Sequence, residues 1–479
     1  MLRQQPIAAG VAGCLAALLL AAGGAAADQQ VLAEVEKERA ASIALADDIW
    51  AFAELGYLET KSSGRLQGYL SDSGFDVESG VADIPTAFLA TYGEGAPVIG
   101  ILAEFDALPG LSQAAKPVRQ PIAEGKPGHA CGHHLFGAAS VSAGVGVARW
   151  LAATGAAGTV RVYGTPAEEG GSGKVYMVRA GLFDDVDVVL HWHPADRNDA
   201  SAASSTANKS GRFRFQGAAA HAASAPERGR SALDGVEAMN FMVNLMREHI
   251  PEDSRIHYVI TDGGDAPNIV PESAEVYYYV RHPKLPTIKA LFERVVKAAE
   301  AAALGTGTQM TYEVMHGNYP VLPNETLARL VDANLRRLGG YAYSPEERRF
   351  AETLHPTLGE SALPLGAQSH VQPFALRQGR GSTDVGDVSW AAPTVGFRTA
   401  TWVPGTPAHS WQAVAAGGTS IGHKGMLLAA QLLALTATDL FQDAGLIKRA
   451  WTELREKRGA DFEYEALLGD REPPLDYRL

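Results

Sequence analysis

Cysteine is nearly absent from this sequence, which has only Cys14 and Cys131 among its 479 residues. Cys14 falls within an apolar N-terminal stretch that we expect to be cleaved from the mature chain. The mature protein would then keep one thiol, which excludes an intrachain disulfide framework. Cys131 is therefore left for packing or for chemistry.

Positive charge is also in short supply, because 41 Lys and Arg residues face 54 Asp and Glu residues, giving a net charge of -13. No basic run offsets this charge, so binding to nucleic acid is not expected. The 46% hydrophobic and 20% charged content is typical of a folded soluble protein and excludes a multi-span membrane protein. The length predicts two domains, or one domain inserted into another.

The N-terminal stretch has the features of a secretory signal peptide. It carries Arg3, continues without charge from 7 to 27, and ends in small residues before Asp28. These features predict cleavage after Ala27 and a periplasmic or secreted protein. The alternative is an anchor: about 20 apolar residues can span a bilayer, and residues 11–14 resemble a lipoprotein box. The Ala- and Gly-rich run and its short length before Cys14 make anchoring the weaker interpretation.

The mature chain starts with a pattern in which helices alternate with apolar strands. Near-continuous apolar strands separated by helices predict an α/β domain with a mostly parallel sheet that is covered on both faces. The expected strands lie at 87–92, 97–104, 159–164 and 186–193, and the expected helices lie near 30–55, 60–74 and 135–154.

From about residue 210 the pattern changes to β-α-β-β-α-β, the order of a ferredoxin-like unit. Its expected strands lie at 211–215, 256–261, 274–281 and 309–314, with helices at 230–249 and 287–303. Because the earlier alternation resumes after 320 and includes a long apolar helix at 423–441, we interpret this unit as an insertion. The predicted division is a signal peptide at 1–27, a main domain at 28–206 and 316–479, and an inserted domain at 207–315.

The two joints between these domains, near 207 and 316, predict a hinge. A site that admits a substrate and then excludes water has to open and close. Gly211 and Gly317 are the expected flexible points. The charged tail from Lys448 is expected to wrap around the surface.

The densest group of reactive side chains is Gly-His-Ala-Cys-Gly-His-His at 128–134, in a loop before a helix. A thiolate and imidazoles this close together can bind one divalent ion. On its own the cluster is equally consistent with a buried cysteine and surface histidines.

Glu168 and Glu169 follow directly on the strand at 159–163. Adjacent carboxylates repel each other unless a cation or a shared proton compensates, so a metal beside them is the economical interpretation. One carboxylate could then bind the metal while the other faces the substrate. The alternative is an acidic helix N-terminus, which the helix dipole favours.

His191 and His193 lie on the same face of a strand because they are two residues apart. His193 is nearer the carboxyl end of the sheet, where sites in α/β folds collect. Either histidine could be a ligand or a core residue. Glu104 and Asp106 likewise lie at the end of an apolar strand.

Taken together, these motifs resemble the M20 metallopeptidase and amidohydrolase family, and within it the branch of the aminobenzoyl-glutamate hydrolase B-type subunits. The resemblance extends from Asp28 to the C-terminus. One departure is His134, where relatives often carry Asp or Asn. The motifs that carry the resemblance lie at 106–109, 129–133, 166–171, 192–194, 221–223, 229–232, 267–271, 382–388 and 406–411.

The resemblance implies a zinc-peptidase-like catalytic domain interrupted by a ferredoxin-like lid and dimerisation domain. It implies that Glu168 is the general base and that His221 and Asn268 hold the scissile carbonyl oxygen or the substrate carboxylate, with His221 often acting across a dimer. Arg281 could assist them. A pair of divalent ions, zinc or manganese, would be bound by Cys131, His133, Glu169, His193 and His409.

The implied activity is metal-dependent hydrolysis of the amide bond of N-acyl amino acids, with aminobenzoyl-glutamate-like substrates favoured. A broader N-acyl-amino-acid or dipeptide hydrolase is the nearest alternative, and a non-catalytic exported metal- or ligand-binding protein is an alternative of another class. The resemblance also implies a homodimer or a complex with a homologous second subunit. The cytoplasmic relatives lack an export signal, so the leader argues against simple inheritance of their substrate.

Overall fold

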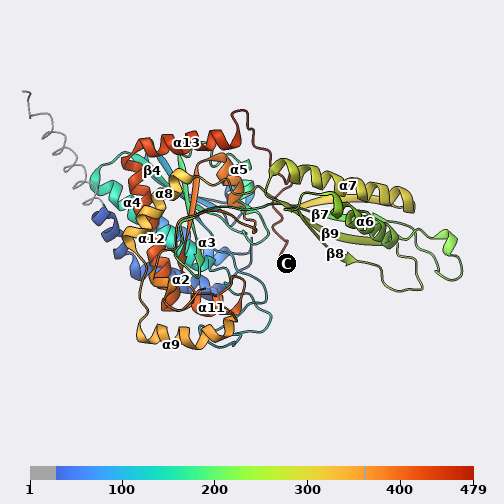
Figure 1. Ribbon diagram of the computed structural model, residues 1–479, viewed down its shortest axis with the longest axis horizontal. Coiled ribbons are helices and arrows are strands. Elements are labelled where there is room, and N and C mark those ends of the chain that lie inside the picture. The colour runs from blue at the N-terminus through green and yellow to red at the C-terminus, as the bar shows by residue number, and fades with distance from the viewer. Residues whose placement is uncertain (1–27, 361–362) are drawn as a thin grey trace, which may run out of the picture.

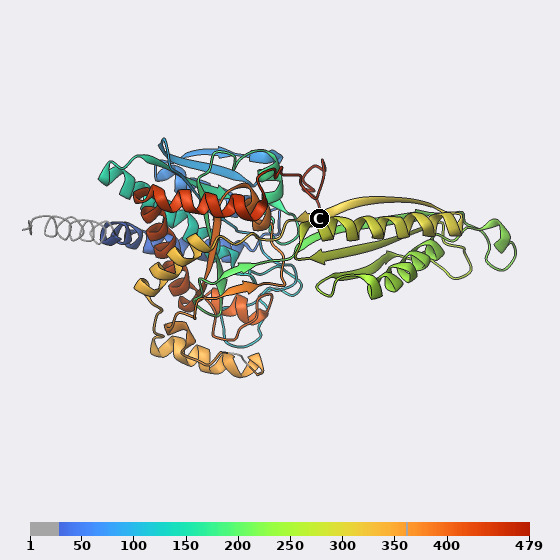
Figure 2. The same cartoon turned by 45° about the horizontal axis from the view of Figure 1, so that its top comes forward.

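The computed structural model describes residues 28–360 and 363–479, so the predicted leader and its cleavage site lie outside the described residues. The described chain forms a main domain and a long arm that extends from one side of it (Figure 1). The same arrangement is visible from a second direction in Figure 2.

The main domain is built on a six-stranded sheet of order β1-β2-β4-β3-β5-β12. The four strands β4, β3, β5 and β12 are parallel, which confirms the predicted parallel-rich α/β fold. The predicted strand at 87–92 is present as β2, but it pairs antiparallel with β4 and with β1, which the sequence pattern did not indicate because β1 is short and mostly exposed. The strands are β1 (Asp76–Ser79), β2 (Phe88–Glu94), β3 (Val98–Ala103), β4 (Gly158–Gly164), β5 (Val188–Ala195) and β12 (Thr394–Ala400).

Two long apolar helices, α4 (His133–Thr154) and α12 (Ser420–Gln442), pack against each other and against this sheet. Small residues in α4 allow the close approach, since a Cβ at Gly144 would lie 2.5 Å from the side chain of Val162. Both helices are long and apolar enough to cross a membrane. However, 89% and 78% of their apolar 18-residue segments are buried inside the protein. They are therefore core helices of the main domain.

Shorter helices and a small second sheet complete the main domain. The small sheet pairs β6 (Ala202–Ser204) with β11 (Leu376–Gln378) in parallel. The helices are α2 (Arg39–Phe52), α3 (Thr60–Asp72), α5 (Gly173–Arg179), α8 (Glu325–Leu338), α9 (Pro345–Leu354), α10 (Val385–Ala391), α11 (Trp411–Gly417) and α13 (Ala444–Arg458).

The arm has the predicted β-α-β-β-α-β order and an antiparallel sheet of order β10-β7-β9-β8. Alternate residues of β9 are buried, and α6 and α7 pack on the sheet and on each other. The elements are β7 (Ala207–Gln216), α6 (Ala232–Met246), β8 (Arg255–Asp262), β9 (Ser273–His282), α7 (Leu285–Thr306) and β10 (Gln309–Asn318).

The expected flexible points at Gly211 and Gly317 are wrong. Both glycines lie inside paired strands, Gly211 between β9 and β10 and Gly317 beside β7. A Cβ at Gly317 would lie 2.7 Å from Leu467, so this glycine permits close packing. Neither residue is free to act as a hinge in this arrangement.

The C-terminal tail agrees with the expectation only in part. The tail that is expected to wrap around the surface from Lys448 begins inside a helix, α13, which spans Ala444–Arg458. The chain that follows runs mostly over the surface, as expected, but Leu467 and Leu468 are buried in the protein core. It then continues to the carboxyl edge of the main sheet, beside the turn that carries Glu168 and Glu169.

Candidate metal centre and active site

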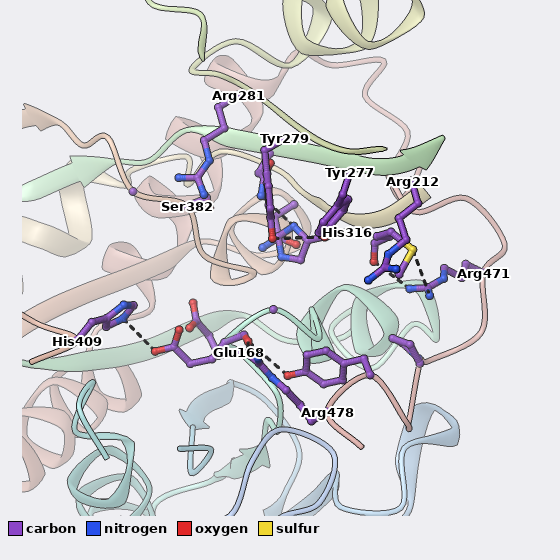
Figure 3. Close-up of a pocket in the computed structure, with 18 residues that line it drawn as sticks. Glu168, Arg212, Tyr277, Tyr279, Arg281, His316, Ser382, His409, Arg471 and Arg478 are labelled. Atoms are coloured by element: carbon purple, nitrogen blue, oxygen red, sulfur yellow. Dashed lines mark hydrogen bonds and ion pairs between the residues drawn. The ribbon is translucent and has the colours of Figure 1, made fainter. Parts of the chain in front are cut away.

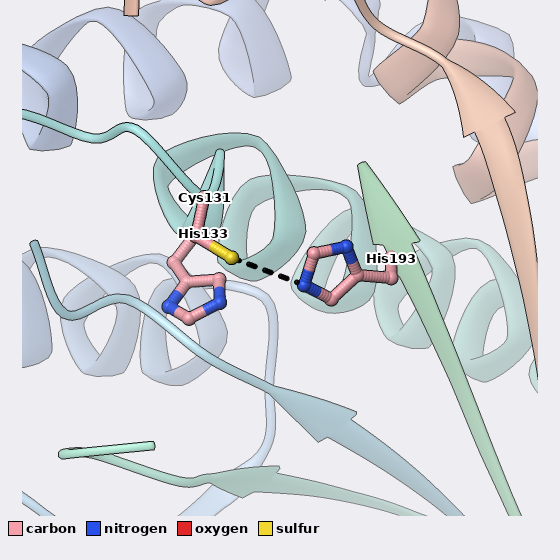
Figure 4. A group of neighbouring side chains, drawn as sticks. All are labelled: Cys131, His133 and His193. Carbon is pink, nitrogen blue, oxygen red and sulfur yellow. Dashed lines mark hydrogen bonds between the residues drawn. The ribbon is translucent and has the colours of Figure 1, made fainter. Parts of the chain in front are cut away.

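Cys131 and His133 are placed at the start of α4 by a turn at Gly132. Gly132 has a φ of +79°, and a Cβ there would lie 2.6 Å from Pro194, so only glycine fits. Cys131 Sγ lies 3.4 Å from Nε2 of His193, which comes from β5 (Figure 4). One ligand atom each from Cys131, His133 and His193 lies within 4.8 Å of the others, close enough to share an ion.

A second donor group consists of Cys131, Glu169 and His409, with the same 4.8 Å limit between ligand atoms. His409 Nε2 lies 3.1 Å from Glu169 Oε1. His409 has a φ of +59°, a strained conformation of the kind that concentrates at functional sites. The two groups share Cys131, and together they contain the five residues that the family resemblance implies as ligands.

The environment of these donors suits cation binding. Burial, reinforced by Glu169, raises the pKa of the Cys131 thiol, so an ion is needed to hold it as a thiolate. Burial, reinforced by His133, lowers the pKa of His193 well below its usual value. His193 is therefore neutral, as a metal-binding imidazole has to be.

Asp106, just beyond the end of β3, orients two of the proposed ligands. Its Oδ1 lies 2.8 Å from His133 Nδ1, and its Oδ2 accepts a 2.9 Å hydrogen bond from the Glu169 backbone. A carboxylate that fixes the ring of a ligating histidine is common at metal sites.

Among the described residues, His133 Nε2 and Glu169 Oε1 are buried without a hydrogen bond, and their ion-pair neighbours, Glu104 Oε2 and His409 Nε2, each lie 3.1 Å away. Buried orphaned polar atoms require an explanation, and a bound cation supplies one. Thiolate, imidazole and carboxylate donors together fit a pair of divalent transition ions.

A buried ion network lies beside the centre. Lys174 Nζ is 2.7 Å from Glu104 and 2.8 Å from Asp384. Burial opposes its charge, but Asp384 and Glu104 nonetheless raise the pKa of Lys174. Glu104 also forms a possible donor group with His133 and Glu168, but the family resemblance gives it no ligand role and its Oε1 pairs with Lys174. We therefore assign Glu104 to this network and not to the ligands.

Glu168 lies on the turn after β4, next to Glu169. Burial raises the pKa of Glu168 well above its usual value, and the charges of Glu104 and Glu169 add to the effect. A carboxylate tuned upward in this way is suited to exchanging protons near neutral pH.

Glu168, Glu169 and His409 line a cavity of about 550 Å³ between the main domain and the base of the arm (Figure 3). Arm strands contribute Arg212, Arg281 and two tyrosines. These tyrosines are Tyr277 and Tyr279, and the remaining lining residues are Gly170, Asn208, Met315, His316, Asn318, Gly381, Ser382, Arg471, Pro474, Tyr477 and Arg478.

Within one chain, His221 and Asn268 are not brought to this cavity. Both are exposed, and their loops meet, since Ala222 N donates to the Asn268 carbonyl at 3.0 Å. These loops, 217–231 and 263–272, lie at the end of the arm farthest from the main domain (Figure 1). They could reach a metal centre only in another chain.

The remaining histidines of the motifs have structural surroundings. The ring of His191 packs over Gly396, where a Cβ would lie 2.2 Å from it. His134 Nε2 donates to the Gly417 carbonyl at 3.2 Å, and His129 Nε2 donates to the Ile49 carbonyl at 2.9 Å. Of the two histidines on β5, His193 is thus the one in ligand position.

Sequence reasoning assigned no role to Asp106, Lys174 or the residues of the C-terminal tail. The available signal for Asp106 was its place at the end of an apolar strand. Lys174 follows the Glu168-Glu169 pair closely, but nothing local shows that it is buried. The sequence has no local signal for the tail, because its contacts with Glu169 span more than 300 residues.

We predict that chelation exposes the Cys131 thiol in the mature chain. In the metal-loaded protein the thiol should resist a thiol reagent, because the ion holds the thiolate. Removal of the metal should make one thiol per chain reactive, and Cys131→Ser should bind less metal and supply the background. A thiol that reacts freely before chelation, with no change afterwards, would contradict the assignment.

Comparison with known proteins places the chain among metallohydrolases. Residues 205–306 match the peptidase dimerisation domain of the M20 family. The chain is 41% identical over 447 residues to the B-type subunit of p-aminobenzoyl-glutamate hydrolase from Escherichia coli, covering 88% of this chain and 93% of that one. It is 31% identical over 434 residues to Xaa-Arg dipeptidase of Mus musculus, covering 86% and 89%.

The fold agrees with that of solved structures. A dinuclear metal-binding peptidase of the M20 family from Bacillus subtilis superimposes with a TM-score of 0.57 at 17% identity, covering 85% of this chain and 99% of that one. The architecture, the donor groups and the identity to a curated relative over most of both chains lead to one conclusion. The chain belongs to the M20 metallopeptidase family, in the branch of the p-aminobenzoyl-glutamate hydrolase B-type subunits, and is a metal-dependent amide hydrolase.

Proposed function

We propose that this protein hydrolyses the amide bond of N-acyl amino acids and favours aminobenzoyl-glutamate-like substrates. The observation that carries the proposal is the position of Glu168, which lines the cavity beside two donor groups that meet at Cys131. The 41% identical relative is a subunit of p-aminobenzoyl-glutamate hydrolase, which directs the choice of substrate.

Two divalent ions, zinc or manganese, would be held by Cys131, His133, Glu169, His193 and His409. When bound, such a pair polarises the scissile carbonyl and lowers the pKa of the attacking water. Glu168 accepts the proton of that water and later delivers it to the leaving amine. Asp106 keeps His133 and the Glu169 turn in place during these steps.

The relative that cleaves Xaa-Arg dipeptides supports a broader dipeptidase as the second candidate. Four arginines line the cavity and would repel a cationic leaving group, so the cavity argues against a dipeptidase that releases arginine. A non-catalytic binding protein is less well supported, because Glu168 and all five proposed ligands are retained. An anionic amino acid therefore fits this cavity best.

The test is activity of the purified mature chain on a panel of N-acyl amino acids after chelation and return of single metals. We expect hydrolysis of N-(4-aminobenzoyl)glutamate with zinc or manganese, and slower hydrolysis of peptides that end in arginine. Binding of the metals without hydrolysis of any substrate in the panel would favour the non-catalytic alternative.

We also propose that the protein is exported and acts as a dimer, either of itself or with a homologous second subunit. The leader supports export, and N-terminal sequencing that finds Met1 on active protein would refute it. The arm supports a dimer, because its edge strand β8 exposes Tyr258, Val259 and Ile260. An unpaired apolar edge is a surface that another chain can cover.

A further inference from the structure

The C-terminal tail is fixed against both domains before it reaches the cavity. Arg179 on α5 donates to the carbonyls of Gly469 and Arg471 at 2.9 and 2.7 Å. Arg471 in turn contacts Glu313 at 3.0 Å and donates to the Met315 carbonyl at 2.9 Å, both on β10 of the arm. The tail is therefore positioned by specific contacts with the main domain and with the arm.

The end of the tail docks onto the turn that carries the carboxylate pair. Tyr477 and Arg478 both donate to the carbonyl of Glu169. The ring of Tyr477 packs edge-on against Tyr57, with 5.6 Å between centroids. At Gly56 a Cβ would lie 2.3 Å from the Tyr477 hydroxyl, so this glycine leaves room for the tail.

The tail brings positive charge into the cavity through Arg471 and Arg478 (Figure 3). Arg471 and the arm residue Arg212 are paired with Glu313 and Glu275. Within residues 28–360 and 363–479, by contrast, the guanidinium groups of Arg281 and Arg478 have no carboxylate within ion-pair distance. Arg478 Nε is also buried without a hydrogen-bond partner there.

The carboxylates that line the cavity, Glu168 and Glu169, face the proposed metal pair, whose charge compensates them. Arg281 and Arg478, which have no carboxylate partner among the described residues, are then available to bind a ligand. Two separated guanidinium groups suit a molecule with two carboxylates, because each can form charge-assisted hydrogen bonds with one of them.

We propose that Arg478, on a tail that Arg471 holds against β10, binds the side-chain carboxylate of the leaving amino acid, and that the tail thereby selects glutamate or aspartate over neutral amino acids. This inference rests on the proposed function, because it assumes that the cavity receives the amino acid half of an amide. Arg281 is left to face the α-carboxylate.

The test compares N-(4-aminobenzoyl)glutamate with N-(4-aminobenzoyl)glutamine, which differ only in the side-chain carboxylate. In Arg478→Met we expect the ratio of kcat/KM for the two substrates to fall by about tenfold or more, as expected for loss of a hydrogen bond to a charged group. Arg478→Lys should retain part of the preference, and Arg471→Met should lose less of it. Lys289→Met, which removes an exposed tail contact outside the cavity, is the matched control and should keep the ratio.

Equal losses of kcat/KM for both substrates in Arg478→Met would overturn the proposal, because they would show that Arg478 only holds the Glu169 turn. An unchanged ratio would also overturn it.

Calorimetric binding of free glutamate and glutamine separates this proposal from the proposed function. If the wild type cleaves neither amide but Arg478→Met selectively weakens glutamate binding, the function fails and the subsite stands. If the wild type does not distinguish the free amino acids and cleaves both amides alike, the subsite fails.

Discussion

Replacement of Glu168 by Gln should lower kcat by at least about 100-fold, the usual scale for loss of a general acid or base. Glutamine keeps the size of the side chain and its place on the turn after β4, but it cannot accept a proton. The metal content, measured by inductively coupled plasma mass spectrometry, should remain at the wild-type level, because Glu168 belongs to neither of the two donor groups that meet at Cys131.

Glu169→Gln is the matched comparison, since it makes the same chemical change one residue away. It should lose metal, because Glu169 Oε1 belongs to the donor group with Cys131 and His409. The two variants therefore separate proton transfer from metal binding. Loss of metal from Glu168→Gln, with activity retained in Glu169→Gln, would reverse the two roles.

The sequence predicted those parts of the fold whose signals are contiguous. The strand at 159–164 and the helix at 135–154 are long apolar runs, and the structure has β4 and α4 at nearly the same bounds. The arm was recognisable because its strands and helices follow a fixed order. β1 escaped recognition because a short exposed edge strand has no apolar pattern to reveal it.

The site was predictable to the extent that its residues occur in compact motifs, such as the cluster around Cys131 and the Glu168-Glu169 pair. Its supporting contacts were not predictable from one sequence. Lys174 reaches Asp384 across 210 residues, and Arg478 reaches Glu169 across 309. Contacts of this kind depend on how segments far apart in the chain pack together, and no local pattern encodes them.

His221 should be required for activity even though it lies far from the metal centre of its own chain. Its Nδ1 accepts hydrogen bonds of 3.2 Å from the backbone of Ala223 and of Ser224. In the neutral ring the proton is therefore on Nε2, which is left as a donor on an exposed loop. A donor there suits a carbonyl oxygen or a carboxylate supplied by the site of another chain.

His221→Ala should consequently be inactive alone, as should Glu168→Gln, but a mixture of the two should recover activity. In a mixed dimer one site combines an intact metal centre with an intact His221 from the other chain, while the second site carries both lesions. Random exchange in a twofold dimer would therefore restore roughly a quarter of the wild-type activity. His249→Ala, which removes another exposed histidine of the arm, is the control and should remain active. No recovery after exchange has been verified with differently tagged chains would show that the site is not completed by a second copy of this chain.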